Sequence, residues 1–293
     1  MSLLSVNRRT AFLTVLAVVG IVSIILMATL QYRAMSDYRL LGEVRVLVSD
    51  IQTNVLTLRR NEKDFLARKD LQYRQRFVDN FDLLQANVRE LSSGLQKSGV
   101  DDTKVKQFDA IIETYKGRFL QIVELQKAIG LDHEDGFYGR LRREIHQVEE
   151  ILRLLRQDQL MKDMLMLRRQ EKDFMLRNDA KYIDRFDKDM VVMQSDLSHA
   201  YLDQRAKRDI STALIAYERD FKALASATRE MGFSSNDGLH GEMRSGIHQG
   251  ERLLGELRQD LLLKESSAGS SMINQIIAFA VVLTLLISAL IRL

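Results

Sequence analysis

The sequence predicts an all-α fold of two stacked four-helix bundles, made of six helices (two of them long) and flanked by two transmembrane helices. Three observations support it. The chain of 293 residues contains no Pro, no Cys and no Trp, and the lack of Pro favours long helices. Two long uncharged segments lie near its ends. A charged motif occurs twice between them, which indicates an internal repeat.

The two uncharged segments, residues 11–30 and 273–291, are long enough to cross a membrane. A helix of about 20 residues spans the roughly 30 Å hydrocarbon core of a bilayer. The first segment is longer than the apolar region of a signal peptide, so we expect an uncleaved anchor.

Basic residues beside these segments predict their orientation. Arg8 and Arg9 precede the first segment and Arg292 follows the second, and such residues favour the cytoplasmic side. We therefore expect both chain ends in the cytoplasm and residues 32–270 in the periplasm, with the chain crossing a bacterial inner membrane twice.

The charged motif, which we call the cassette, occurs at residues 58–68 and 167–177. The first copy reads L-R-R-N-E-K-D-F-L-A-R and the second L-R-R-Q-E-K-D-F-M-L-R. Each copy places a glutamate, Glu62 or Glu171, on the apolar stripe of its predicted helix. A carboxylate in a helical core requires a partner.

A glycine-rich block follows each cassette, at residues 130–149 and 232–251. Both blocks contain G-x4-D-G-x2-G and end in I-H-Q-x-E. An arginine lies four residues before the histidine in each block, so the two side chains share one helix face. We expect Arg244 and His248 to face Glu62, and the equivalent face of the first block to lie at the height of Glu171.

Helix-breaking residues separate the six predicted helices. The breaks are expected at 69–70, 98–101, 156–159, 178–179 and 202–203. The glycine-rich blocks are expected as kinks within the two long helices, because both membrane segments need an even number of helical passes between them. A straight helix over 137–177 is the alternative to the turn at 156–159.

The predicted domains follow from these elements. They are a cytoplasmic N-terminus (1–10), a transmembrane helix (11–30), a periplasmic domain (32–270) with a proximal module (about 33–130 plus 238–270) and a distal module (about 131–231), a second transmembrane helix (273–291) and the start of a cytoplasmic part (292–293).

Two polar sites are expected, one in each module. The proximal site comprises Arg59, Arg60, Glu62, Tyr115, Arg244 and His248, and the distal site comprises Arg142, His146, Arg168, Glu171 and Tyr217. Three interpretations stay open: pairing that fixes helix register, a small polar or anionic ligand between helices, or a metal ion. Di-metal bundles use Glu-x-x-His, whereas this chain has His-x-x-Glu. We expect no metal, cofactor or catalytic residue, and the small net charge of +3 gives no support for nucleic-acid binding.

The motif L-R-R-x-E-K-D-F in each half, between two membrane segments, resembles the helical bimodular sensor domain of bacterial chemoreceptors of the methyl-accepting type. The resemblance covers about residues 35–270. It implies a periplasmic sensor of small organic acids in which arginines of the first helix, here Arg59 and Arg60, reach the proximal pocket. Glu62 departs from an all-arginine lining and keeps an amino acid, an amine or an aromatic acid open as the ligand.

The resemblance also implies a homodimer that passes a signal to cytoplasmic proteins. The family continues after the second membrane helix into a signalling module, so we expect this chain to be the sensory half of a receptor. The sensor half of a histidine kinase or cyclase, and a structural or adaptor membrane protein, remain alternatives.

Overall fold

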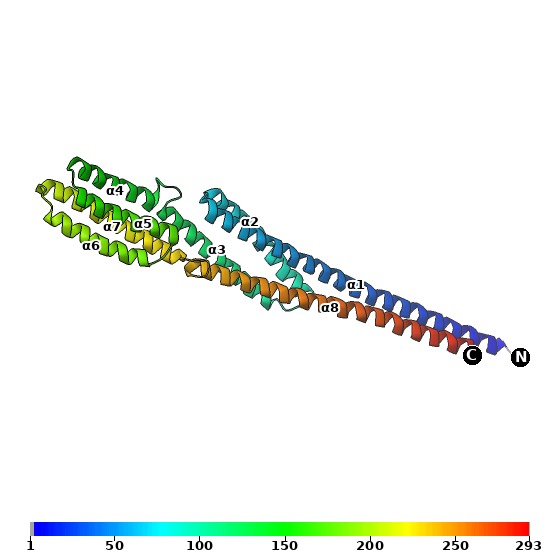
Figure 1. Ribbon diagram of the computed structural model, residues 1–293. Coiled ribbons are helices and arrows are strands. Elements are labelled where there is room, and N and C mark those ends of the chain that lie inside the picture. The colour runs from blue at the N-terminus through cyan, green and yellow to red at the C-terminus, as the bar shows by residue number, and fades with distance from the viewer. Residues whose placement is uncertain (1–2, 293) are drawn as a thin grey trace. The chain divides into compact units, whose positions relative to one another are not determined.

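The computed structural model describes residues 3–292 and consists of helices and short loops (Figure 1). No strand occurs among these residues, so the predicted all-α class is confirmed. Residues 1–2 and 293, which belong to the predicted cytoplasmic ends, lie outside the described residues. The helices are α1 (Leu3–Arg68), α2 (Leu71–Lys97), α3 (Thr103–Ile129), α4 (Gly136–Leu154), α5 (Asp158–Arg177), α6 (Lys181–His199), α7 (Gln204–Met231) and α8 (Gly238–Arg292).

The two long helices of the prediction are each divided in two, so the described residues form eight helices rather than six. Each glycine-rich block is a loop between helices, not a kink within one. Gly130 and Gly136 have φ values of 129° and 55°, and Gly232 and Gly238 have 108° and 53°. A right-handed helix cannot continue through residues with positive φ. Glycine adopts positive φ at the lowest steric cost because it has no Cβ.

The predicted turn between the third and fourth predicted helices is confirmed. α4 ends at Leu154 and α5 begins at Asp158, so a straight helix over 137–177 is wrong. Arg156 has a φ of 51°, and this single left-handed residue reverses the chain without Gly or Pro. The remaining predicted breaks also coincide with helix ends.

The described residues divide into two compact units. Unit 1 comprises the described residues up to Val55, residues Leu83–Asp109 and the described residues from Glu251 onward. Unit 2 comprises Leu56–Asp82 and Ala110–Gly250.

Unit 1 is held together by segments of α1, α2, α3 and α8. Side chains such as Val48 and Leu91 are fully buried between them. α1 and α8 run side by side and are linked by an ion pair of 3.3 Å between Arg45 Nη1 and Glu265 Oε2 (Figure 1). Both helices are long and apolar enough to cross a membrane, and their terminal segments expose large apolar side chains.

Unit 2 contains two four-helix groups. In the first, aromatic rings of α1 and α2 meet Phe119 of α3, and Arg118 of α3 forms an ion pair with Glu242 of α8. In the second, α4 and α6 each pack against both α5 and α7. The two groups repeat one aromatic core. Phe77 stacks on Phe119 with ring centroids 4.0 Å apart, and Phe186 stacks on Phe221 at the same distance. The phenylalanine of each cassette meets its stack edge-on.

Candidate functional site

The two cassette glutamates are buried, as their place on the apolar stripe predicts. Glu62 is 7% exposed and Glu171 is 2% exposed. Tyr115 Oη donates a hydrogen bond to Glu62 Oε2, and Tyr217 Oη donates one of 2.6 Å to Glu171 Oε2. The lysine that follows each glutamate forms an ion pair with it, at 2.9 Å and 2.5 Å respectively. Both carboxylates therefore find their partners within the protein.

One consequence is that Tyr217 acts as a permanent donor. Burial, followed by the neighbouring Glu171 carboxylate, raises the pKa of Tyr217 well above its ordinary value. The phenol therefore keeps its proton and the hydrogen bond that the proton makes.

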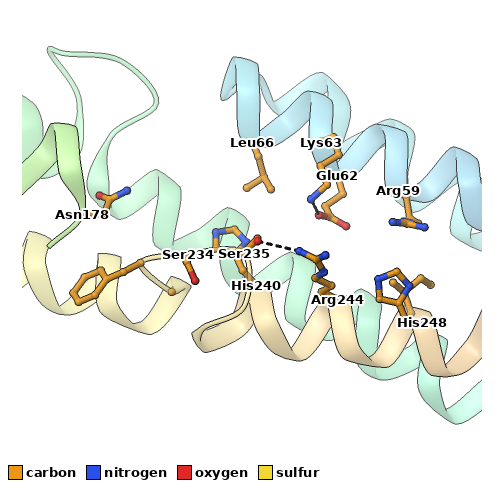
Figure 2. A pocket seen from close by; sticks show the side chains of 13 residues that line it. Arg59, Glu62, Lys63, Leu66, Asn178, Ser234, Ser235, His240, Arg244 and His248 are labelled. Carbon is orange, nitrogen blue, oxygen red and sulfur yellow. Dashed lines mark hydrogen bonds and ion pairs between the residues drawn. The ribbon is translucent and has the colours of Figure 1, made fainter.

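Pocket 1 is a cavity of about 560 Å³ beside Glu62, and all its lining residues belong to unit 2 (Figure 2). Burial lowers the pKa of His240 in its wall. Arg244 Nη1 donates a hydrogen bond of 3.1 Å to Ser235 Oγ, and no described carboxylate lies within ion-pair distance of Arg244. The lining residues are Arg59, Glu62, Lys63 and Leu66 of α1, Asn178, Gly232 to Ser235 of the α7–α8 loop, and His240, Arg244, Ile247 and His248 of α8.

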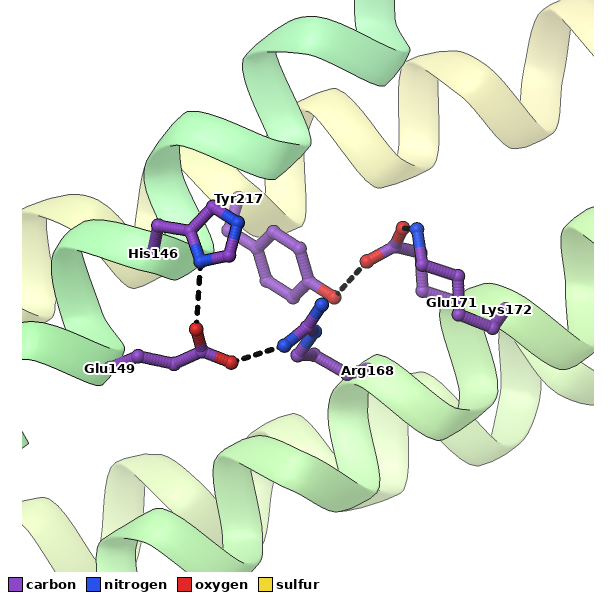
Figure 3. A network of polar contacts seen from close by, with 6 residues as sticks. All are labelled: His146, Glu149, Arg168, Glu171, Lys172 and Tyr217. Carbon is purple, nitrogen blue, oxygen red and sulfur yellow. Dashed lines mark hydrogen bonds and ion pairs between the residues drawn. The ribbon is translucent and has the colours of Figure 1, made fainter. Parts of the chain in front are cut away.

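Pocket 2 is a cavity of about 640 Å³ beside Glu171, also within unit 2. Arg168 Nη1 donates to Glu149 Oε1, and His146 Nδ1 lies 2.8 Å from Glu149 Oε2 (Figure 3). Arg142 has no ion-pair partner among the described side chains. The lining residues are Lys69, Asp132 and His133, then Tyr138, Arg142, Ile145 and His146 of α4, and Arg168, Glu171, Lys172 and Met175 of α5.

The two pockets are built from equivalent positions of the repeat, with the repeats exchanged. Pocket 1 combines the first cassette with the second glycine-rich block. Pocket 2 combines the second cassette with the first block. Each repeat therefore contributes its cassette to one pocket and its block to the other. Glu62 and Arg244 line the same pocket, and so do Glu171 and Arg142, as the spacing of the repeats predicts.

Three of the expected site residues do not line a pocket. Arg60 is exposed and lies outside both linings, because one residue along a helix turns the side chain by about 100°. Tyr115 and Tyr217 lie behind the glutamates, which they hold by hydrogen bonds.

The structure adds residues that the sequence prediction missed. Most of them could have been found from the repeat, because Tyr138 and His240, like Lys63 and Lys172, occupy equivalent positions. Lys69 and Asn178 also occupy equivalent positions. Nothing in the sequence, however, indicates that each of them lines the pocket of the other cassette. The lining residues missed are Lys63, Leu66, Asn178, Gly232 to Ser235, His240 and Ile247 in pocket 1, and Lys69, Asp132, His133, Tyr138, Ile145, Lys172 and Met175 in pocket 2.

Both pockets carry more basic than acidic side chains, and the described residues include no group of three His, Cys, Asp or Glu side chains arranged to hold a metal ion. Comparisons with models of known protein families, with curated proteins and with solved structures give no match to this chain. The function of the two pockets is therefore inferred from their own chemistry.

Proposed function

We propose that this chain is the ligand-sensing part of a bacterial transmembrane receptor and that small organic anions bind in its two pockets. One observation carries the proposal. Each pocket contains an arginine without a carboxylate partner among the described side chains, Arg244 in pocket 1 and Arg142 in pocket 2. A guanidinium binds a carboxylate through two parallel hydrogen bonds.

The cassette glutamates do not oppose an anionic ligand. Each carboxylate is already bound by a tyrosine hydroxyl and a lysine ammonium. Its negative charge is therefore compensated before any ligand arrives, and the basic side chains that line each pocket outnumber the acidic ones. The cavity volumes, about 560 and 640 Å³, lie within the usual range for small-molecule sites.

The helices that line pocket 1 suggest how binding is reported. α1 carries Glu62 and α8 carries Arg244, and the same two helices hold the apolar segments. A ligand held between the two side chains shifts α8 by an ångström or two relative to α1, a common scale for receptor signalling. We place the pockets in the periplasm and the apolar segments in the inner membrane.

In this proposal the receptor acts as a homodimer and directs cytoplasmic signalling proteins, as a chemoreceptor of the methyl-accepting type does. The two apolar segments and the duplicated sensor support this class. A sensor half of a histidine kinase or a cyclase would use the same pockets and the same membrane helices with another output.

A structural or adaptor role is the second candidate. The observation that favours it is the internal satisfaction of both glutamates, because a paired polar core fixes helix register without any ligand. Such a protein needs no unpaired arginine in either cavity. The two candidate functions therefore differ in their expected result: substitution of Arg142 or Arg244 weakens ligand binding only if the protein is a receptor.

The deciding experiment is a ligand screen on the full chain in lipid nanodiscs, followed by isothermal titration of each hit. The panel holds carboxylates, amino acids, amines and aromatic acids. We expect Arg142→Ala and Arg244→Ala each to weaken a hit about tenfold or more, since a charged hydrogen bond contributes about 1.5–3 kcal/mol. Arg153→Ala, on the exposed surface of α4, is the control. Absence of any hit, or hits that neither pocket variant weakens, contradicts the receptor proposal.

A further inference from the structure

Lys69 and Asn178 hold equivalent positions directly after the two cassettes. Both adopt left-handed backbone, with φ of 53° and 49°, and both end their helix in the same way. Lys69 N donates to Phe65 O at 2.7 Å, and Asn178 N donates to Phe174 O at 2.8 Å. Each residue lies in the pocket of the opposite cassette, because Lys69 lines pocket 2 and Asn178 lines pocket 1.

Lysine is an unfavourable choice at this backbone position. Residues other than glycine adopt left-handed backbone at a cost, and asparagine tolerates it best. The second repeat uses the favoured residue and the first does not. Backbone strain of this kind clusters at functional sites.

The Lys69 side chain is partly buried in pocket 2 and has no counter-ion in the part of the chain that the structure describes. Its Nζ lies 5.1 Å from the centroid of the Tyr138 ring. No described carboxylate is within ion-pair distance of it, and burial lowers the pKa of this lysine. A partly desolvated ammonium whose neighbour is an aromatic ring lacks a negatively charged partner, and a bound anion would supply one.

The other charges of pocket 2 already have partners. Arg168 is bound to Glu149, and Lys172 is bound to Glu171. Asp132 Oδ1 accepts a hydrogen bond of 2.8 Å from a backbone N–H within its own loop. Lys69 and Arg142 are therefore the two cations in this pocket that no carboxylate among the described residues neutralises.

We propose that pocket 2 binds a small dianion, such as a dicarboxylate, and that Lys69 determines its preference for a dianion over a monoanion. The inference rests on the proposed function. Arg142 takes one carboxylate of the ligand and Lys69 takes the other. Pocket 1 has Arg244 and the neutral Asn178 at the equivalent positions and lacks this second cation.

The test uses the full chain in nanodiscs with Arg244→Ala already introduced, so that pocket 2 is measured alone. Malonate and acetate are the dianionic and monoanionic probes in isothermal titration. Lys69→Asn is expected to weaken malonate about tenfold, the effect of one lost charged hydrogen bond, and to change acetate by less than about threefold. Without probe, the same variant is expected to unfold at a higher temperature, because asparagine relieves the backbone strain.

Lys97→Asn is the matched control, because it removes the same charge at an exposed helix end of unit 1. It is expected to leave both affinities unchanged. Equal malonate affinity with Lys69 and with Asn at this position, or an equal loss for acetate and malonate, overturns the role of Lys69. If the parent chain binds neither these probes nor any other carboxylate, the proposed function fails and this inference fails with it.

Discussion

Tyr217 Oη donates a hydrogen bond of 2.6 Å to Glu171 Oε2 within the group formed by α4, α5, α6 and α7, where both side chains are buried. The equivalent hydrogen bond joins Tyr115 to Glu62 in the other group. These two contacts explain how a carboxylate occupies the apolar stripe of each cassette helix. The tyrosine supplies the hydrogen-bond donor that a buried carboxylate requires.

Removing this donor should destabilise the protein. Tyr217→Phe leaves Glu171 buried with the lysine as its remaining partner, and we expect a loss of about 1–3 kcal/mol in the free energy of unfolding. Denaturant titration followed by circular dichroism measures it. Tyr201→Phe is the control, since Tyr201 is fully exposed. An unchanged free energy for Tyr217→Phe would show that the hydrogen bond contributes nothing.

The Glu171 site should also tolerate a fully apolar replacement. Without the Glu171 carboxylate, the Tyr217 hydroxyl loses its hydrogen-bond acceptor. We therefore expect the double variant Glu171→Leu with Tyr217→Phe to be closer to the parent in stability than Glu171→Leu alone. A double-mutant cycle on the free energy of unfolding measures the coupling. Additive losses of unfolding free energy from the two substitutions would contradict the proposed pairing of Tyr217 with Glu171.

Acidification should stabilise unit 2 through Glu144. Burial, followed by the nearby Asp220 carboxylate, raises the Glu144 pKa from 4.5 to about 7. Its Oε2 atom is buried without a hydrogen-bond partner, and Arg219, Arg140 and Arg143 offset the effect only in part. Between pH 4.5 and 7 the folded chain holds a proton that the unfolded chain releases, so stability falls as the pH rises through this window.

Glu144→Gln isolates that contribution. We expect the variant to gain stability relative to the parent at pH 8 and to lose the advantage at pH 5, as measured by thermal unfolding at both values. Asp220 does not interfere. Burial alone would raise its pKa, but the hydrogen bonds and positive charges of Arg219 and Arg140 together lower the pKa from its ordinary value of 3.8. Its own contribution is lost only as the pH falls below that range. A difference between variant and parent that is the same at both pH values contradicts the assignment.

The loop glycines should be far less replaceable than the helix glycines. A Cβ at Gly136 would lie 2.4 Å from the Ala128 carbonyl oxygen, at a φ of 55°, so we expect Gly136→Ala to cost about 1–3 kcal/mol. Gly117 in α3 has open space around it, and Gly117→Ala should gain about 0.5–1 kcal/mol. Denaturant titration of both variants provides the comparison, and a gain at Gly136 would show that the loop backbone is not strained.

The helices, most of their ends and the two apolar segments follow from local patterns, so they could be predicted. The repeat also brings Glu62 to Arg244, because equal helix rise keeps the two blocks in register. The glycine-rich loops could not be recognised, since a glycine in a kink and a glycine at positive φ look the same in a sequence. The sequence pattern does not predict the pairing of Lys172 with Glu171, because neighbouring residues on a helix do not face each other. The long lysine side chain nevertheless reaches the carboxylate.

The exchange of Lys69 and Asn178 between the pockets lay beyond prediction for another reason. Both residues end a helix, and the sequence at a helix end does not indicate which distant segments pack against it. Only the packing of the loops within unit 2 brings each of them to the cavity of the other cassette.

The measurement that tests the central claim most directly is the stoichiometry of anion binding to the full chain in nanodiscs. Titration with a carboxylate selected by the screen should give two sites of parent affinity per chain for the parent, one for Arg142→Ala, one for Arg244→Ala and none for the double variant. Undiminished binding by the double variant, or no binding by the parent to any carboxylate, would contradict the account of two equivalent anion pockets.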